Sequence, residues 1–255
     1  MPNRPCRTAR VEPHPPIWPA APHLAPTDSH PGPRNYAALA SRPMSLLVVD
    51  HPLVAHRITL LRDERTPSPV FRRAVSEIAA LLAYEATRNL HVDPVSVRTP
   101  TGSDAQGARL HAPGPLLVPI LRAGLGLLDG FLTVLPEAEV GIVGLRRNEE
   151  TFEPEQYAEK LPARLEGRDV FVLDPMLATG GSLAFTCQLL VNRGAERITA
   201  VSVISAPEGV ARAQKACPTL RIVTAAHDPG LNEQRYIVPG LGDAGDRLFG
   251  QSTSA

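Results

Sequence analysis

Apolar residues follow a helical repeat in the first regular part of the chain, which starts near Met44. Spacings of three and four residues separate Phe71, Val75, Ile78 and Leu82. Such spacing predicts a helix with one buried face, reaching about Arg88. Ser68 and Pro69 stand just before this face. A hydroxyl residue followed by proline is typical of a helix start, so we expect Ser68 to cap this helix.

Short apolar runs dominate the rest of the chain, at residues 116–121, 140–145, 170–173, 198–204 and 220–225. Most are unbroken rather than alternating, as expected for strands covered on both faces. Helical segments fit between them, from about Gly124 to Leu135, from Gly181 to a left-handed cap at Gly194, and from about Glu208 to Ala216. Strands that alternate with helices predict an α/β domain with a parallel sheet.

The loops that follow these strands are the expected place of function, because ligands of parallel sheets lie beyond the carboxyl ends of the strands. The loop after residues 170–173 consists of Asp174, Pro175, Met176, Leu177, Ala178, Thr179, Gly180, Gly181 and Ser182. Small residues before a helix let several backbone N–H groups point at one anion, which the helix dipole also favours. The alternative is a plain strand-to-helix turn with Asp174 in solvent.

Two other phosphate-binding motifs do not fit the chain. A Walker A loop needs a lysine where Gly181 stands, and the glycines at 124, 126 and 130 miss the dinucleotide-binding spacing by one residue. The loop is expected to be exposed, so replacing Gly180 with valine should impair phosphate binding and leave the fold intact.

Residues 1–43 differ in character from the rest, holding 11 of the 27 prolines and no helix or strand period. Proline fixes φ and lacks a backbone donor, which predicts an extended or disordered extension. The predicted domain spans residues 44–255. Because Met44 lies just before the apolar start at Leu46, the preferred explanation is an upstream start codon chosen in error, and a genuine tail is the alternative.

Composition narrows the function classes. Lysine plus arginine and aspartate plus glutamate number 26 each, so the chain as a whole has no attraction to nucleic acid or an anionic membrane. No apolar run approaches a membrane span and residues 1–43 lack a signal-peptide core. The three cysteines are far apart, which fits a reducing compartment and neither zinc nor disulfides. We expect a cytoplasmic protein.

Four motifs in order carry a family resemblance: residues 118–126 (VPILRAGLG), 147–151 (RNEET), 174–182 (DPMLATGGS) and 236–245 (YIVPGLGDAG). Together they resemble the uracil phosphoribosyltransferase family, from about His51 to Gly250. The third motif alone resembles the phosphoribosyltransferases in general, and the fourth is similar to the uracil enzymes. Many relatives have two acidic residues where this chain has Asp174 and Pro175, but the uracil enzymes look like this chain.

The resemblance implies that residues 174–182 bind 5-phosphoribosyl 1-diphosphate, with the 5-phosphate on residues 178–182 and the ribose hydroxyls on Asp174. Arg122 and Arg147 would stabilise the leaving diphosphate, and Asp243 would reach the ribose side. These three residues are the expected catalytic set. Related transferases also hold a non-proline cis peptide, which matches the bond near Leu121–Arg122.

The fourth motif implies the uracil site, with Ile237, Gly242, Asp243 and Ala244 as the binding residues. A glycine-rich segment can press backbone donors and acceptors against a flat base; the alternative is a glycine-rich surface loop. The expected fold is therefore a phosphoribosyltransferase-type core with a C-terminal base-binding hood. Residues 148–162 would form a mobile cover that excludes water.

The implied activity is pyrimidine salvage, a pentosyl transfer that gives UMP and diphosphate. Mg²⁺ would be bound mainly through the donor substrate, with no protein metal ligand. A homo-oligomer is expected and a GTP effector is a further possibility that the sequence leaves open. Two alternatives remain: a pyrimidine-operon RNA-binding regulator on the same fold, and an inactive member that assembles with a kinase.

Overall fold

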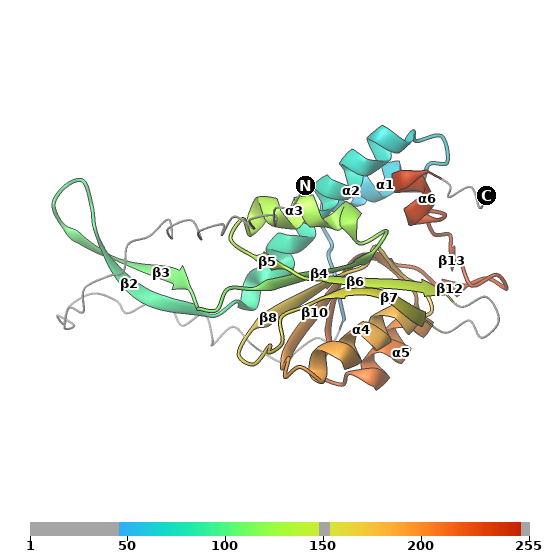
Figure 1. Cartoon of the computed structure of the whole chain (residues 1–255). Coiled ribbons are helices and arrows are strands. Elements are labelled where there is room, and N and C mark those ends of the chain that lie inside the picture. Colours follow the sequence, from blue (N-terminus) through green and yellow to red (C-terminus); the bar gives the residue numbers. More distant parts are fainter. Residues whose placement is uncertain (1–45, 148–153, 251–255) are drawn as a thin grey trace, which may run out of the picture. The chain divides into compact units, whose positions relative to one another are not determined.

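The computed structural model describes residues 46–147 and 154–250, with the Arg147 side chain left out of that description. A nine-stranded sheet forms its centre (Figure 1). The main path runs in the order β1 (Leu46–Val48), β11 (Arg221–His227), β10 (Arg197–Ser205), β8 (Asp169–Leu173), β4 (Leu116–Leu121), β6 (Ile142–Arg147) and β7 (Pro154–Lys160). Neighbouring strands are parallel except β7, which runs antiparallel to β6. Short strands β5 (Glu139–Val140) and β9 (Met176–Leu177) pair with β4 and β10.

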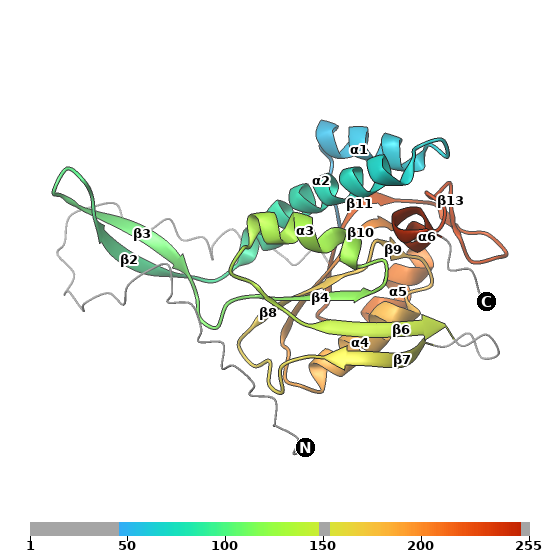
Figure 2. The same ribbon diagram turned by 45° about the horizontal axis from the view of Figure 1, so that its top comes forward.

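Helices cover both faces of this sheet, as both views show (Figure 1 and Figure 2). One face carries α1 (Pro52–Arg62), α2 (Ser68–Ala86) and α3 (Leu125–Val134); the other carries α4 (Gly181–Val191) and α5 (Pro207–Ala216). The apolar run of strand β4 is unbroken because its side chains are buried on both faces of the sheet. Leu117 packs into the core on the α2 side, whereas Leu116 and Val118 pack into the core on the α4 side. The predicted α/β fold with a mainly parallel sheet is confirmed.

The predicted cap of α2 is wrong. Ser68 is the first residue inside the helix, and Pro67 holds the cap position with no capping side chain. The extended backbone of Pro67 already lets its carbonyl accept the Phe71 N–H at 2.9 Å. The helix ends at Ala86, and a 3₁₀ turn over Thr87–Asn89 continues it.

Elements with little apolar patterning escaped prediction. Helix α1 buries only Val54, Ile58 and Leu61, and the antiparallel pair β2 (Val92–Arg98) and β3 (Asp104–Leu110) is largely exposed. Strand β7 occupies part of the segment predicted as a cover; residues 148–153 of that segment lie outside the described residues. The predicted extension at residues 1–43 lies outside them too.

The C-terminal segment forms its own small structure. Strands β12 (Gly230–Leu231) and β13 (Ile237–Val238) pair antiparallel, and α6 (Ala244–Phe249) follows. Helix α6 packs beside α2 (Figure 2). Among the described residues, no helix combines the length and apolar character needed to cross a membrane.

Candidate active site at the carboxyl ends of the strands

The predicted strand–loop–helix unit is present after β8. The loop leaves the sheet at Leu173, and α4 begins at Gly181 with Gly180 at its N-cap in the left-handed region (φ 73°). A Cβ on Gly180 would lie 2.5 Å from the Gly209 carbonyl oxygen in α5. Gly180 is buried, so the expectation of an exposed, tolerant loop is wrong at this position. Valine there would push α5 away as well as alter the loop.

The loop's hydroxyl side chains are placed to receive an anion. Thr179 and Ser182 are both partly exposed, and within the part of the chain that the structure describes neither hydroxyl makes a hydrogen bond. Backbone N–H groups at the start of α4 lie beside them and carry the positive end of the helix dipole. This combination of donors suits a phosphate group.

Asp174 sits directly at the end of β8 and is partly buried. Removal from water raises its pKa from 3.8 to about 6. One long hydrogen bond, from the Met176 N–H at 3.5 Å, opposes this rise only in part. The carboxylate therefore keeps unused acceptor capacity at the edge where a ligand is expected.

The turn after β4 brings Arg122 next to this loop. Its glycine, Gly124, packs so tightly that a Cβ would lie 2.4 Å from the carbonyl oxygen of Leu173, the last residue of β8. The Leu121–Arg122 peptide is cis, as predicted. The Arg122 guanidinium is half-exposed and lies 3.7 Å from the Asp246 carboxylate of α6. Arg147 ends β6.

A cavity of about 470 Å³ joins these loops to the C-terminal segment. The loops contribute Arg122, Ala123, Met176 and Ala178; the C-terminal segment contributes Gln234, Arg235, Tyr236, Ile237, Gly242, Asp243, Ala244 and Gly245. Seven predicted site residues therefore meet here: Arg122, Met176, Ala178, Ile237, Gly242, Asp243 and Ala244. The other loop residues from Asp174 to Ser182 lie beside the cavity without lining it.

Several lining residues had not been predicted, among them Gln234 and Arg235. Arg235 has a positive φ of 64°, which sequence could not reveal. Tyr236 could have been proposed, because it opens the fourth motif. Asp243 has a role beyond the predicted one, since its carboxylate accepts the Asp246 N–H at 2.9 Å and caps α6.

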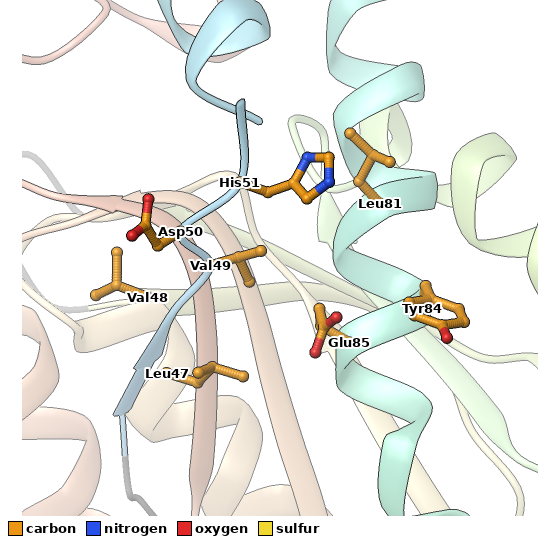
Figure 3. Close-up of a pocket in the computed structure, with 8 residues that line it drawn as sticks. All are labelled: Leu47, Val48, Val49, Asp50, His51, Leu81, Tyr84 and Glu85. Atoms are coloured by element: carbon orange, nitrogen blue, oxygen red, sulfur yellow. The ribbon is translucent and has the colours of Figure 1, made fainter. Parts of the chain in front are cut away.

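A second cavity, of about 450 Å³, lies between edge strand β1 and α2 (Figure 3). Leu47 and Val49 point toward α2, whereas Val48 and Asp50 point the other way, as strand alternation requires. No arginine or lysine of the described ranges lines it, and the His51 ring nitrogen already accepts the Leu53 N–H at 3.1 Å. It therefore lacks the cations that a diphosphate needs. The cavity at Arg122 is the better candidate.

The fold and the arrangement of the site are those of the phosphoribosyltransferase class: a mainly parallel sheet, with a small-residue loop before a helix and an arginine-bearing turn at the ends of neighbouring strands. The family model "Uracil phosphoribosyltransferase" matches residues 48–251. The chain belongs to the uracil phosphoribosyltransferase family. Its activity is the transfer of the phosphoribosyl group to uracil, which gives UMP in pyrimidine salvage.

Individual relatives agree with this assignment. A uracil phosphoribosyltransferase from Nocardioides sp. is 58% identical over 80% of this chain and 97% of its own length. The one from Streptomyces coelicolor is 55% identical over 81% and 99%. A solved structure from Aquifex aeolicus is similar with a TM-score of 0.77 and 38% identity, covering 82% of this chain and 99% of that one.

Proposed function

We propose that the donor substrate lies across the ends of β8, β4 and β6. The 5-phosphate would bind residues 178–182, where backbone N–H groups and the Thr179 and Ser182 hydroxyls converge. Asp174 would accept hydrogen bonds from the ribose hydroxyls, and the backbone of Pro175, Met176 and Leu177 would flank the sugar. Arg122 and Arg147, each at the end of its strand, would face the diphosphate.

Uracil is proposed to occupy the cavity between Arg122 and the C-terminal segment. Backbone groups of Ile237, Gly242 and Ala244 would complement the two carbonyls and two N–H groups of the base. Asp243 would reach from this side toward the ribose. The observation that carries the proposal is the cavity itself. It is lined both by Arg122, the arginine expected to face the diphosphate, and by the C-terminal segment expected to bind the base.

The proposed chemistry is displacement of diphosphate at the anomeric carbon by a uracil nitrogen. Negative charge develops on the leaving diphosphate, so a fixed guanidinium at Arg122 stabilises the transition state more than the ground state. Among the described residues that line the cavity there is no histidine, cysteine or serine, and direct displacement needs no such nucleophile. The site's own residues would supply positioning and electrostatics.

Mg²⁺ fits this site as a companion of the substrate. Among the described residues, no group of three or more histidine, cysteine, aspartate or glutamate side chains could hold a metal ion. Magnesium commonly keeps several waters and binds through substrate phosphates with few protein ligands. When bound together with the donor, it would offset the negative charge of the leaving group, and Asp174 would hold the ribose of that donor.

Two finer proposals rest on the family resemblance: the chain forms a homo-oligomer and responds to GTP as an effector. A third, that the chain works in the cytoplasm, rests on the wide spacing of its three cysteines. The proposal that residues 44–255 form the phosphoribosyltransferase domain has additional support, because the family match covers residues 48–251.

Steady-state kinetics of UMP formation test the site. Arg122→Lys keeps the charge but loses the planar fork, so kcat should fall roughly 10- to 100-fold. Gly242→Ala should raise the KM for uracil about tenfold with little change for the donor, because φ is +77° there and the backbone must shift. Arg164→Ala, a change at an exposed arginine paired with Glu166, is the control. Wild-type kinetics in both site variants would remove this cavity from the active site.

A further inference from the structure

A buried carboxylate outside the four motifs holds the C-terminal loop. Asp228 follows the end of β11 and is 4% exposed. Arg62, the last residue of α1, donates from Nη1 to Asp228 Oδ2 at 2.9 Å and from Nη2 to Oδ1 at 2.5 Å. The Gly240 N–H donates to Asp228 Oδ2 at 2.9 Å, and Arg62 Nη1 also donates to the Gly240 carbonyl at 2.8 Å. Both polar backbone groups of Gly240 are therefore bound by this ion pair.

Gly240 is the corner of the loop between Ile237 and Gly242. Its φ is +65°, and a Cβ would lie 2.1 Å from the Ile237 carbonyl oxygen. A backbone this tightly turned cannot shift at one residue without moving the other. The position of Gly240 therefore sets the positions of Ile237 and Gly242, which line the cavity.

Arg247 fixes the same loop from its other side. Its Nη1 donates to the carbonyl oxygens of Leu61 and, at 2.8 Å, Leu241, while Nη2 donates to the Asp63 carbonyl at 2.7 Å. The guanidinium also lies 4.2 Å from the centre of the Phe71 ring. The end of α1 and the following turn thus form a platform on which the loop is held.

We infer that Asp228 and Arg62 are positioning residues for uracil, which fix the backbone that recognises the base without touching it. The inference rests on the proposed uracil site. Recognition by backbone groups depends on the loop conformation alone, because no side-chain rotamer can adjust to the ligand. Loosening Gly240 should therefore weaken uracil binding and the choice of uracil over cytosine, and leave the donor site nearly unchanged.

Asp228→Asn is the principal test. An amide retains one acceptor and presents an N–H group toward donors of Arg62 or Gly240, so at least one bond is lost. The KM for uracil should rise about tenfold or more and the preference for uracil over cytosine should fall, whereas the KM for the donor should change by less than about twofold. Arg62→Lys, which keeps the charge and loses the fork, should show the same split in milder form.

Asp169→Asn is the matched control. Asp169 forms a similar pair with Arg197, at 2.8 and 3.3 Å, but it begins β8 and so lies at the opposite end of the strand from Asp174. Both Asn variants should lower the thermal midpoint, and only Asp228→Asn should raise the KM for uracil.

Equal effects of the two Asn variants on the uracil KM would overturn the inference. If Asp228→Asn does not fold, the kinetic split of Arg62→Lys decides the question in the same way. Gly242→Ala separates this outcome from a misplaced uracil site. A normal uracil KM in Gly242→Ala refutes the proposed uracil site itself. If the uracil KM is raised in Gly242→Ala but normal in the Asp228 and Arg62 variants, only the positioning role of Asp228 and Arg62 is refuted.

Discussion

Replacing Asp174 with asparagine should make the protein more stable at neutral pH and less active. The folded-state pKa of Asp174 is raised from 3.8 to about 6 by burial. At pH 7.5 the carboxylate is ionised in both states, and its desolvation costs about 3 kcal/mol, since each pKa unit corresponds to about 1.4 kcal/mol. Asparagine has nearly the same shape without this charge, so Asp174→Asn should recover part of that cost.

The pH dependence gives the prediction its sign. A raised carboxyl pKa means that the folded state binds the proton more tightly, so the stabilisation is fully present below the unfolded pKa of 3.8 and is lost as the pH rises through about 6. Between pH 7.5 and pH 4.5 the wild type should gain about 2 kcal/mol that Asp174→Asn cannot gain. The variant's advantage in unfolding free energy should shrink by that amount, as urea titrations at the two pH values would measure.

Activity should change in the opposite direction. Loss of one charged hydrogen bond to a ribose hydroxyl, about 1.5–3 kcal/mol, corresponds to a roughly 10- to 150-fold lower kcat/KM for the donor. In the wild type, kcat/KM for the donor should also rise as the pH passes about 6, because Asp174 becomes ionised. Ionisation of the donor's own phosphates raises kcat/KM in both proteins, so the additional rise in the wild type is the part that reports on Asp174. A stability difference that is the same at pH 4.5 and pH 7.5 would refute the account of Asp174.

Two further predictions concern the base and the extension. Cytosine should be a poorer substrate than uracil by roughly 10⁴-fold, because a site wired for one hydrogen-bonding edge leaves buried groups unpaired with another; comparable UMP- and CMP-forming rates would contradict the uracil cavity. A chain that begins at Met44 should match the full chain in thermal midpoint and UMP formation, because residues 1–43 precede the family match; a loss of activity beyond about twofold would show that they contribute.

Sequence patterning predicted the centre of the fold because that centre is covered on both faces. Strands β4, β8 and β10 are bounded nearly as expected, since both faces of such a strand are buried and favour an apolar residue at most positions. The β2–β3 pair was not predicted, because most of its residues are exposed and it therefore has no apolar run. Helix α1 was not predicted, because its three buried residues give too weak a helical repeat.

Contacts between segments that are distant in sequence could not be predicted. The motifs indicated which loops form the site, but they did not indicate that Gly124 packs against the end of β8 or that Gly180 packs against Gly209. Those contacts depend on tertiary packing, and they decide which residues line the cavity and which lie behind it. The resemblance supplied Ile237 and Gly242, whereas Arg235 became visible only through its backbone conformation.

Asp174 and Asp228 illustrate a distinction that sequence cannot make. Each is an aspartate directly after an apolar strand, and burial acts to raise the pKa of both. At Asp228 the hydrogen bonds from Arg62 and Gly240 outweigh burial, so its pKa is lowered and its acceptor capacity is already used. At Asp174 the one opposing contact in the described part of the chain is the long hydrogen bond from the Met176 N–H, so burial raises its pKa and leaves acceptor capacity for a ligand. Opposite pKa shifts thus separate a carboxylate whose acceptors are used within the fold from one whose acceptors stay available, as the proposed ribose contact requires.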